Sequence, residues 1–172
     1  MLNRQNAIIA VLILLAIASR LLPHPPNFAP IAAIALFGGA MFSSRALAFL
    51  LPLGVMLIGD ALIGFHSHMP VVYGLFLLTV LIGFAMRGRA KMGTVVGASL
   101  LSSTLFFLGS NLAVWYGSGF YSQDWAGLMT CYTMAIPFFQ NTVLGDLFYT
   151  GALFGTYFWI SQRYPSAKLA RS

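Results

Sequence analysis

Long apolar runs separated by short polar segments are the feature that most limits how this chain can fold. Hydrophobic residues make up 59% of the sequence and charged residues only 7%. A soluble domain usually carries about 25% charged residues, so this chain has too few charges to cover a surface that faces water. The runs are continuous, whereas the strands of a membrane β-barrel alternate apolar and polar residues. The sequence therefore predicts an all-α integral membrane protein.

Six apolar runs predict a single transmembrane domain of six helices over residues 1–172. Each transmembrane helix needs about 20 residues, so six of them leave room only for short loops. The first run is followed by further apolar sequence rather than by a soluble domain, which favours a retained helix over a cleaved signal peptide. The predicted spans are 7–22, 31–42, 46–65, 71–86, 92–115 and 138–160.

Prolines set two of the predicted boundaries. Four of the eight residues in 23–30 are proline, so this segment is predicted to be a stiff, extended loop. The span that follows it is short, which indicates that part of this loop dips toward the membrane. Residues 127–136 are predicted to form a short lead-in helix that ends at Pro137, ahead of the sixth span.

The basic residues predict the orientation. If the N-terminus lies inside, the inner segments contain eight of the nine Lys and Arg residues, and the three outer loops contain none. The eight inner residues are Arg4, Arg45, Arg87, Arg89, Lys91, Arg163, Lys168 and Arg171. The positive-inside rule therefore places both termini on the cytoplasmic side. On this interpretation the net charge of +6 reflects membrane topology, and we predict no nucleic-acid partner.

The polar residues inside the predicted spans gather near the outer face and come from four different helices. An ionised side chain within a bilayer is costly unless it is paired or lines a wet cavity. We therefore predict a pocket that opens to the outside and binds a small molecule. The candidate substrate-binding residues are Arg20, His24, Asn27, Asp60, Asn111, Trp115, Gln140, Asn141 and Asp146.

The same polar residues also fit a purely structural interpretation. Arg20 could pair with Asp60 or Asp146 and so fix the packing of the helices. The amide side chains could form hydrogen bonds between helices, as polar groups in membranes often do. The Trp and Tyr residues near the outer face could form an interfacial belt. The sequence leaves both interpretations open.

No pattern typical of catalysis is present. The sequence contains no Glu and lacks a nucleotide-binding glycine motif, an HExxH motif and a GxSxG motif. We therefore predict no enzyme activity, no catalytic residue and no cofactor. A metal ion could be bound by His66 and His68 together with His24 or Asp60, and Cys131 could act as a soft ligand. Loop histidines more often lie in water and a lone cysteine is more often a core residue, so no metal site is predicted.

Two segments resemble a known family. Residues 20–31 (RLLPHPPNFAPI) with 35–40 (ALFGGA), and residues 135–149 (AIPFFQNTVLGDLFY), are similar to the opening and closing motifs of an uncharacterised bacterial membrane family. That family is grouped with the S components of energy-coupling factor (ECF) transporters. The resemblance implies a six-helix S-component fold in the bacterial cytoplasmic membrane.

The resemblance also implies a function. S components bind a vitamin-like micronutrient in an outward-facing pocket that is capped by the loop between the first two helices, and many associate with an ECF-type energising module. Some relatives are solitary cobalamin transporters of similar size, which makes a cobalamin-type ligand the first expectation. The leading hypothesis is therefore a substrate-binding membrane protein for micronutrient uptake.

Three alternatives to uptake remain. The first is an ion- or proton-coupled permease or channel in which Asp60 and Asp146 titrate. The second is a membrane metalloprotein that uses His24, His66 and His68 on the outer face. The third is a scaffold without transport activity.

Overall fold

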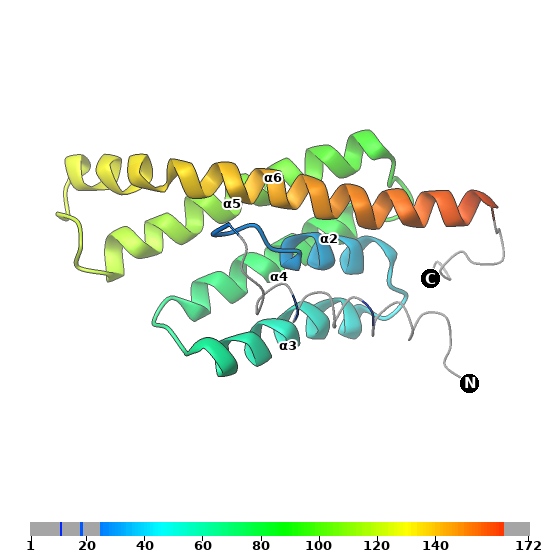
Figure 1. The fold of residues 1–172 in the computed structure, drawn as a ribbon, viewed down its shortest axis with the longest axis horizontal. Coiled ribbons are helices and arrows are strands. Elements are labelled where there is room, and N and C mark those ends of the chain that lie inside the picture. Colours follow the sequence, from blue (N-terminus) through cyan, green and yellow to red (C-terminus); the bar gives the residue numbers. More distant parts are fainter. Residues whose placement is uncertain (1–10, 12–17, 19–24, 164–172) are drawn as a thin grey trace.

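The computed structural model describes residues 11, 18 and 25–163, and this part of the chain forms a helical bundle without strands (Figure 1). The predicted first span, 7–22, lies almost entirely outside the described residues, as do Arg20 and His24. The helices that follow begin and end within two residues of the predicted second to fifth spans. They are α2 (Ile31–Met41), α3 (Arg45–Ile63), α4 (Met69–Ala85) and α5 (Met92–Gly117).

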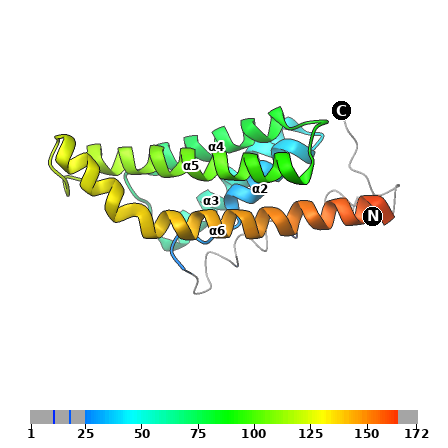
Figure 2. The same cartoon turned by 90° about the horizontal axis from the view of Figure 1, so that it is seen from above.

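The last helix, α6 (Trp125–Arg163), corrects one prediction. It is a single helix of 39 residues with Pro137 in its interior, so Pro137 does not end a lead-in helix. Figure 2 shows that α6 changes direction between its first part and the rest of its length. A proline in a helix can be accommodated as a kink instead of a break. Contacts with α5 on both sides of the kink, from Tyr132 and from Asp146, hold the two parts of the helix in place.

The connections between the helices place residues of different charge at opposite ends of the bundle. The turns after α2 and α4 and the end of α6 lie at one end, whereas the turns after α3 and α5 lie at the other (Figure 1). The described basic residues, which are Arg45, Arg87, Arg89, Lys91 and Arg163, all belong to the first end. His66, His68 and Asp124 belong to the second. The separation of charge predicted from the sequence is thus present in three dimensions.

The outward faces of the bundle are apolar. Helices α3 and α5 are long and apolar enough to cross a membrane, while α2 and α4 are shorter apolar helices. Large aliphatic side chains on α3 and α5, such as Leu50, Leu62 and Leu101, are exposed. The two charged residues in the interiors of the described helices, Asp60 and Asp146, are instead buried. Soluble proteins rarely expose apolar surface on this scale.

Helix α2 lies at the centre of the bundle, and its backbone directly touches that of α4. A Cβ atom at Gly39 would lie 2.3 Å from the carbonyl oxygen of Val80, and one at Gly83 would lie 2.5 Å from that of Leu36. No side chain fits in either place. Small residues allow helices in membranes to approach this closely, so the glycine pair fixes where α2 sits against α4.

Arg87 fixes the end of α2. Its Nε donates to the carbonyl oxygen of Gly39 at 2.8 Å, and its Nη2 donates to that of Phe42 at 2.7 Å. A cation at this position also interacts favourably with the negative end of the helix dipole. Partial burial and the nearby charge of Arg45 lower the pKa of Arg87. Arg87, which we interpreted from the sequence only as a topology signal, therefore also has a structural role.

The contact between α2 and α4 yields a test. We expect Gly39→Ala to lower the melting temperature of the purified protein, because the added methyl group overlaps the backbone of α4. Overpacking of this kind typically costs about 1–3 kcal/mol. The control is Gly97→Ala on α5, where an added Cβ meets nothing within 4 Å. Gly97→Ala should melt at or above the wild-type temperature, and a Gly39→Ala protein that did the same would contradict the proposed packing.

Candidate functional site

The segment that precedes α2 forms a compact turn. The backbone N–H of Phe28 donates to the carbonyl of Pro25 at 3.0 Å, and Asn27 has a φ of 64°. Proline at the second position and a positive φ at the third are typical of a type II turn, and Asn tolerates this conformation better than most residues. The described part of the predicted extended loop is therefore folded back on itself, because Asn27 reverses the chain direction.

This turn reaches in between the helices. The Phe28 ring lies 6.0 Å from the ring of Phe148 and 5.5 Å from that of Tyr149. A Cβ atom on Gly145 would lie 3.0 Å from the Cα of Phe28, so glycine at this position leaves room for the turn. Helix α2 begins only partway along the bundle (Figure 1), and residues 25–30 occupy part of the space that it leaves.

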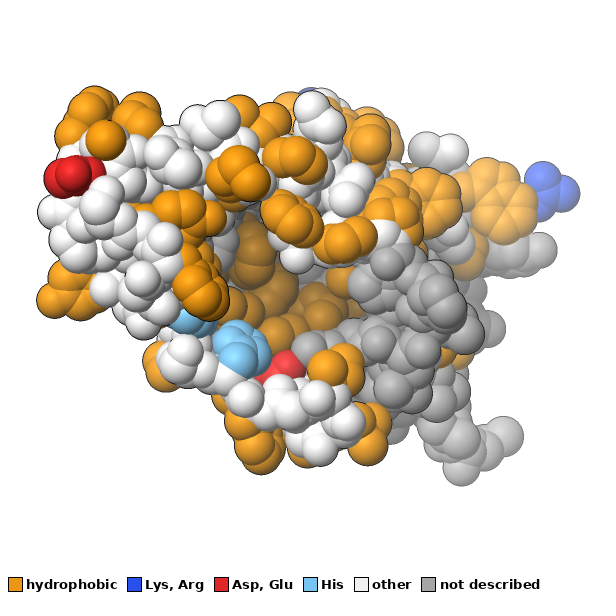
Figure 3. Space-filling view, turned by 60° about the vertical axis from the view of Figure 1, so that its left-hand side comes forward, with side chains coloured by type: hydrophobic (Ala, Val, Ile, Leu, Met, Phe, Trp, Pro, Cys, Tyr) orange, Lys and Arg blue, Asp and Glu red, His pale blue; other side chains and the backbone are white. Residues whose placement is uncertain are grey.

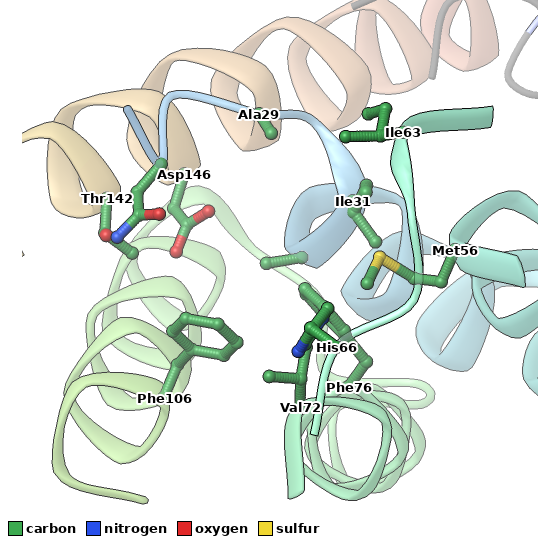
Figure 4. Close-up of a pocket in the computed structure, with 12 residues that line it drawn as sticks. Ala29, Ile31, Met56, Ile63, His66, Val72, Phe76, Phe106, Thr142 and Asp146 are labelled. Carbon is green, nitrogen blue, oxygen red and sulfur yellow. The ribbon is translucent and has the colours of Figure 1, made fainter. Parts of the chain in front are cut away.

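A cavity of about 410 Å³ lies beside this turn. Its size falls within the range of small-molecule sites, which is roughly 300–1,000 Å³. Most of its wall is apolar, and its polar lining residues are Asn27, His66, Thr142 and Asp146. Figure 4 shows Thr142 and Asp146 of α6 on one side of the cavity, across from His66 and Met56. A few converging polar groups in an apolar wall are typical of a ligand site.

A second cavity of about 360 Å³ adjoins the first. The two share the lining residues Asn27, His66, Val72, Phe106 and Thr142. The second cavity extends along α5 toward Asn111 and the turn that carries His68. Figure 3 shows a hollow lined by hydrophobic side chains, with histidine and an acidic side chain at its edge. The cavities therefore belong to the end of the bundle that carries the histidines.

The structure brings three of the predicted site residues to these cavities. Asn27 lines both, Asp146 lines the first and Asn111 lines the second. Asp60 lies close to them, since Met56 and Ile63, one turn before and after it on α3, line the first cavity. Its Oδ2 accepts a hydrogen bond of 2.8 Å from the hydroxyl of Tyr73. Asp60 thus links α3 to α4 beneath the cavity wall.

Three other predicted residues do not line either cavity. The indole Nε1 of Trp115 donates to the carbonyl of Ser122 at 2.9 Å, so Trp115 holds the turn between α5 and α6. Gln140 is exposed and Asn141 is half-buried on α6. Arg20 and His24 lie outside the described residues.

The register of α6 explains why Asp146 lines a cavity while Gln140 does not. Residues four apart share one face of a helix, and Thr142, Asp146 and Thr150 are all buried on the inward face. Gln140 precedes this series by two residues and therefore points elsewhere. The spacing of these three residues was a signal available in the sequence. Sequence reasoning also left Thr142, His66 and Phe106 out of the site, because Phe106 resembles any core residue and His66 lies in a loop.

Asp146 is the centre of a buried polar group. Its Oδ2 accepts a hydrogen bond of 2.6 Å from the hydroxyl of Ser103 on α5. The hydroxyls of Ser99, Ser102 and Thr150 are buried nearby on the two helices and have no hydrogen-bond partner among the described residues. Each unsatisfied buried polar group costs about 1–3 kcal/mol; His68 Nε2 and Ser161 Oγ are further such groups in the described part of the chain, but only around Asp146 do three of them gather.

The turn between α5 and α6 is held by its own contacts. Oδ1 of Asp124 accepts hydrogen bonds from the backbone N–H of Gly127 at 2.7 Å and from the hydroxyl of Ser122 at 2.8 Å. These bonds hold the pKa of Asp124 below its usual value. Asp124 therefore acts as an N-cap for α6, and this turn forms the outer limit of the bundle beyond the cavities.

The described residues offer no ready metal centre. No three of their His, Cys, Asp or Glu side chains lie close enough together to share an ion. His68 contacts the hydroxyl of Ser67 at 3.3 Å, while His66 faces the cavities. Cys131 is buried, and its Sγ lies 3.5 Å from the carbonyl oxygen of Asn111. His24, the third histidine of that hypothesis, lies outside this part of the chain.

The chain belongs to a family of unknown function, DUF6580, whose model matches residues 1–167. No curated protein and no solved structure matches it. Any function must therefore be argued from the cavities and the residues around them.

The packing of the turn on α6 can be tested by thiol labelling. In a protein that carries Asn27→Cys and Cys131→Ser, we expect Gly145→Val to increase the rate of maleimide labelling at residue 27 severalfold. The larger side chain displaces Phe28 and exposes the turn. Gly151→Val is the matched control, since a Cβ there meets nothing within 4 Å. Equal labelling rates in the two variants would show that the turn does not depend on Gly145.

Proposed function

We propose that this chain is a substrate-binding membrane protein for the uptake of a vitamin-like micronutrient. The observation that carries the proposal is the cavity beside the turn at residues 25–30, in the space that the short helix α2 leaves within the bundle. Its apolar wall and few polar groups suit a small organic molecule. Asn27 and Ala29 of the turn line the cavity, so that the turn would close over a ligand there.

We further propose that the protein is a multi-pass protein of the bacterial cytoplasmic membrane, with its basic end in the cytoplasm. The apolar outer faces of α3 and α5 and the inward position of Asp60 and Asp146 support this placement. With a helix formed by the N-terminal segment, the bundle would have six spans and both termini in the cytoplasm. This is the architecture that the resemblance to ECF S components implies.

The size of the two cavities narrows the ligand class. A compact vitamin with donor groups would fit the first cavity, where Asp146, Asn27 and Thr142 supply acceptors. A cobalamin-type ligand is larger and would need both cavities as one site. The shared lining residues make this possible, since the two spaces meet at Phe106 and Thr142.

Release to the cytoplasm requires that the site open toward the basic end. No catalytic residue is proposed for this chain, so energy must come from an ion gradient or from a partner. An ECF-type energising module is the partner that the resemblance implies. The exposed side chains of Arg45, Arg89 and Lys91 lie at the end where such a module would bind.

A second candidate function is an ion-coupled permease. The observation that favours it is the burial of Asp146, which has a hydroxyl partner but no cationic partner among the described residues. Intramembrane carboxylates of this kind mark ion pathways in many transporters.

Reporter fusions test the proposed orientation. Alkaline phosphatase should be active when fused after Ser67 or Gly119, because these turns lie at the end that we place outside. A fluorescent protein that folds only in the cytoplasm should be bright when fused after Gly88, in the basic turn. The positive-inside rule gives the physical reason. The reverse pattern at these three positions would show that the orientation is wrong.

Ligand binding can be measured by thermal shift on the purified chain. We expect one member of a panel of thiamine, riboflavin, biotin and cobalamin to raise the melting temperature. A ligand at 100 times its Kd adds about 2.7 kcal/mol to stability. Ala32→Phe should abolish the shift by filling the first cavity, and Ala113→Phe should abolish it only for a ligand that needs both.

Ala152→Phe, on an exposed face of α6, is the matched control and should leave the shift unchanged. If no compound shifted the melting temperature, the uptake hypothesis would be contradicted for this panel. Ion flux into proteoliposomes that Asp146→Asn abolished would then favour the permease.

A further inference from the structure

Most of the Ser and Thr hydroxyls on α4, α5 and α6 are satisfied within their own helix, but a few buried ones are not, Ser161 near the end of α6 among them. Seven of the hydroxyls donate to the carbonyl oxygen four residues earlier, as is usual for Ser and Thr in helices. They are Thr79, Ser103, Thr104, Ser110, Thr130, Thr133 and Thr142. Ser99, Ser102 and Thr150 do not, although they are only 2%, 4% and 2% exposed. Their hydroxyls therefore remain available for another partner.

These three residues lie around Asp146. Helices α5 and α6 are antiparallel neighbours, and the bond between Ser103 and Asp146 sets their register. One turn further along each helix, this register places Ser99 opposite Thr150. Ser102 is adjacent to Ser99 on the buried side of α5. We call Ser99, Ser102, Ser103 and Thr150 the hydroxyl cluster.

The charge of Asp146 is not balanced within the described part of the chain. Its partner there is the hydroxyl of Ser103, and no cationic side chain pairs with it. Ser103 has a single hydrogen, and two acceptors lie within reach of it: Asp146 Oδ2 at 2.6 Å and the carbonyl oxygen of Ser99 at 3.0 Å. The carboxylate thus has at most one shared donor. A buried carboxylate in an apolar bundle requires more compensation than this.

We propose that the hydroxyl cluster and Asp146 bind a Na⁺ ion. Hydroxyl and carboxylate oxygens are the ligands that hard cations prefer, and Na⁺ shares this preference with Ca²⁺ and Mg²⁺. The single carboxylate of Asp146 neutralises one positive charge, so a buried site here favours a monovalent over a divalent ion. Helices α5 and α6 are in direct contact here, so the site favours a small ion over K⁺. Three of the ion's ligands would be the hydroxyl oxygens of Ser99, Ser102 and Thr150, which have no partner among the described residues.

The position of the site has a consequence for the cavity. Asp146 contacts the hydroxyl cluster through Ser103 and also belongs to the lining of the first cavity. A Na⁺ ion would therefore lie directly beside a ligand in that cavity. The inference goes beyond the proposed function, because cation binding does not depend on whether the cavity accepts a vitamin.

Thermal unfolding of the purified full-length chain tests the site without any vitamin. NaCl is varied at constant ionic strength, with choline chloride as the balance, and KCl replaces NaCl in a parallel series. We expect the melting temperature to rise with Na⁺ and to saturate, as linkage requires, and to rise much less with K⁺. We call the Na⁺ concentration that gives half of the full rise in melting temperature the Na⁺ midpoint. Thr150→Val, which keeps the side-chain shape, should raise this midpoint at least about tenfold.

Two further variants make the test specific. Ser99→Ala should weaken Na⁺ binding in the same way, because it also removes a ligand. Thr104→Ala is the matched control, since the Thr104 hydroxyl is bonded to Leu100 on the exposed side of α5. Thr104→Ala should therefore leave the Na⁺ midpoint unchanged. The proposal would be overturned if the melting temperature were the same in choline, K⁺ and Na⁺ at equal ionic strength. It would also be overturned if the Na⁺ midpoint were unchanged in both Thr150→Val and Ser99→Ala. A failed vitamin screen would leave this result intact.

Discussion

The direct contact between the backbones of α2 and α4 determines the rest of the site. The contact at Gly39 and Gly83 holds α2 against α4, and Arg87 fixes its end near the basic turns. With 11 residues, α2 rises only about 16 Å. The hydrocarbon core of a bilayer is about 30 Å thick. A helix fixed at one end of the bundle therefore leaves nearly half of this depth to other parts of the chain.

Residues 25–30, which precede α2, have a composition that suits the space that this short helix leaves. Irregular backbone at membrane depth leaves N–H groups that must be satisfied, and it is tolerated only where it is buried in protein or lines a cavity. Pro25, Pro26 and Pro30 have no backbone N–H, so the segment carries fewer donors that need a partner. The N–H of Phe28 is bonded within the turn. Proline thus lowers the cost of placing a turn beside the cavity.

The sequence was sufficient to predict α2 to α5, but not the continuity of α6 or how the helices face one another. The long apolar runs located α2 to α5, because Asp60 is the one charged residue in the interiors of these four helices. The kink at Pro137 could not be told from a helix end, since only packing against α5 keeps the helix continuous. Asn111 and Asp146 were proposed as site residues because polar groups are rare in such runs, and Asn27 because it lies in the proline-rich segment 23–30; all three line a cavity. Gln140 and Asn141 line neither cavity, because polarity alone does not give the register of a helix, and their role in binding stays a prediction.

The two interpretations of the polar residues differ in the hydrogen bonds that they lead one to expect. Polar groups that only join helices should be satisfied, as Asp60 is by Tyr73 and as Tyr132 is by the carbonyl of Leu108. The hydroxyls of Ser99, Ser102 and Thr150 are not satisfied within the described part of the chain. Leaving three buried hydroxyls without partners costs about 1–3 kcal/mol each. An arrangement that costs this much in an otherwise well-packed helix pair is expected where a ligand or ion supplies the missing partner.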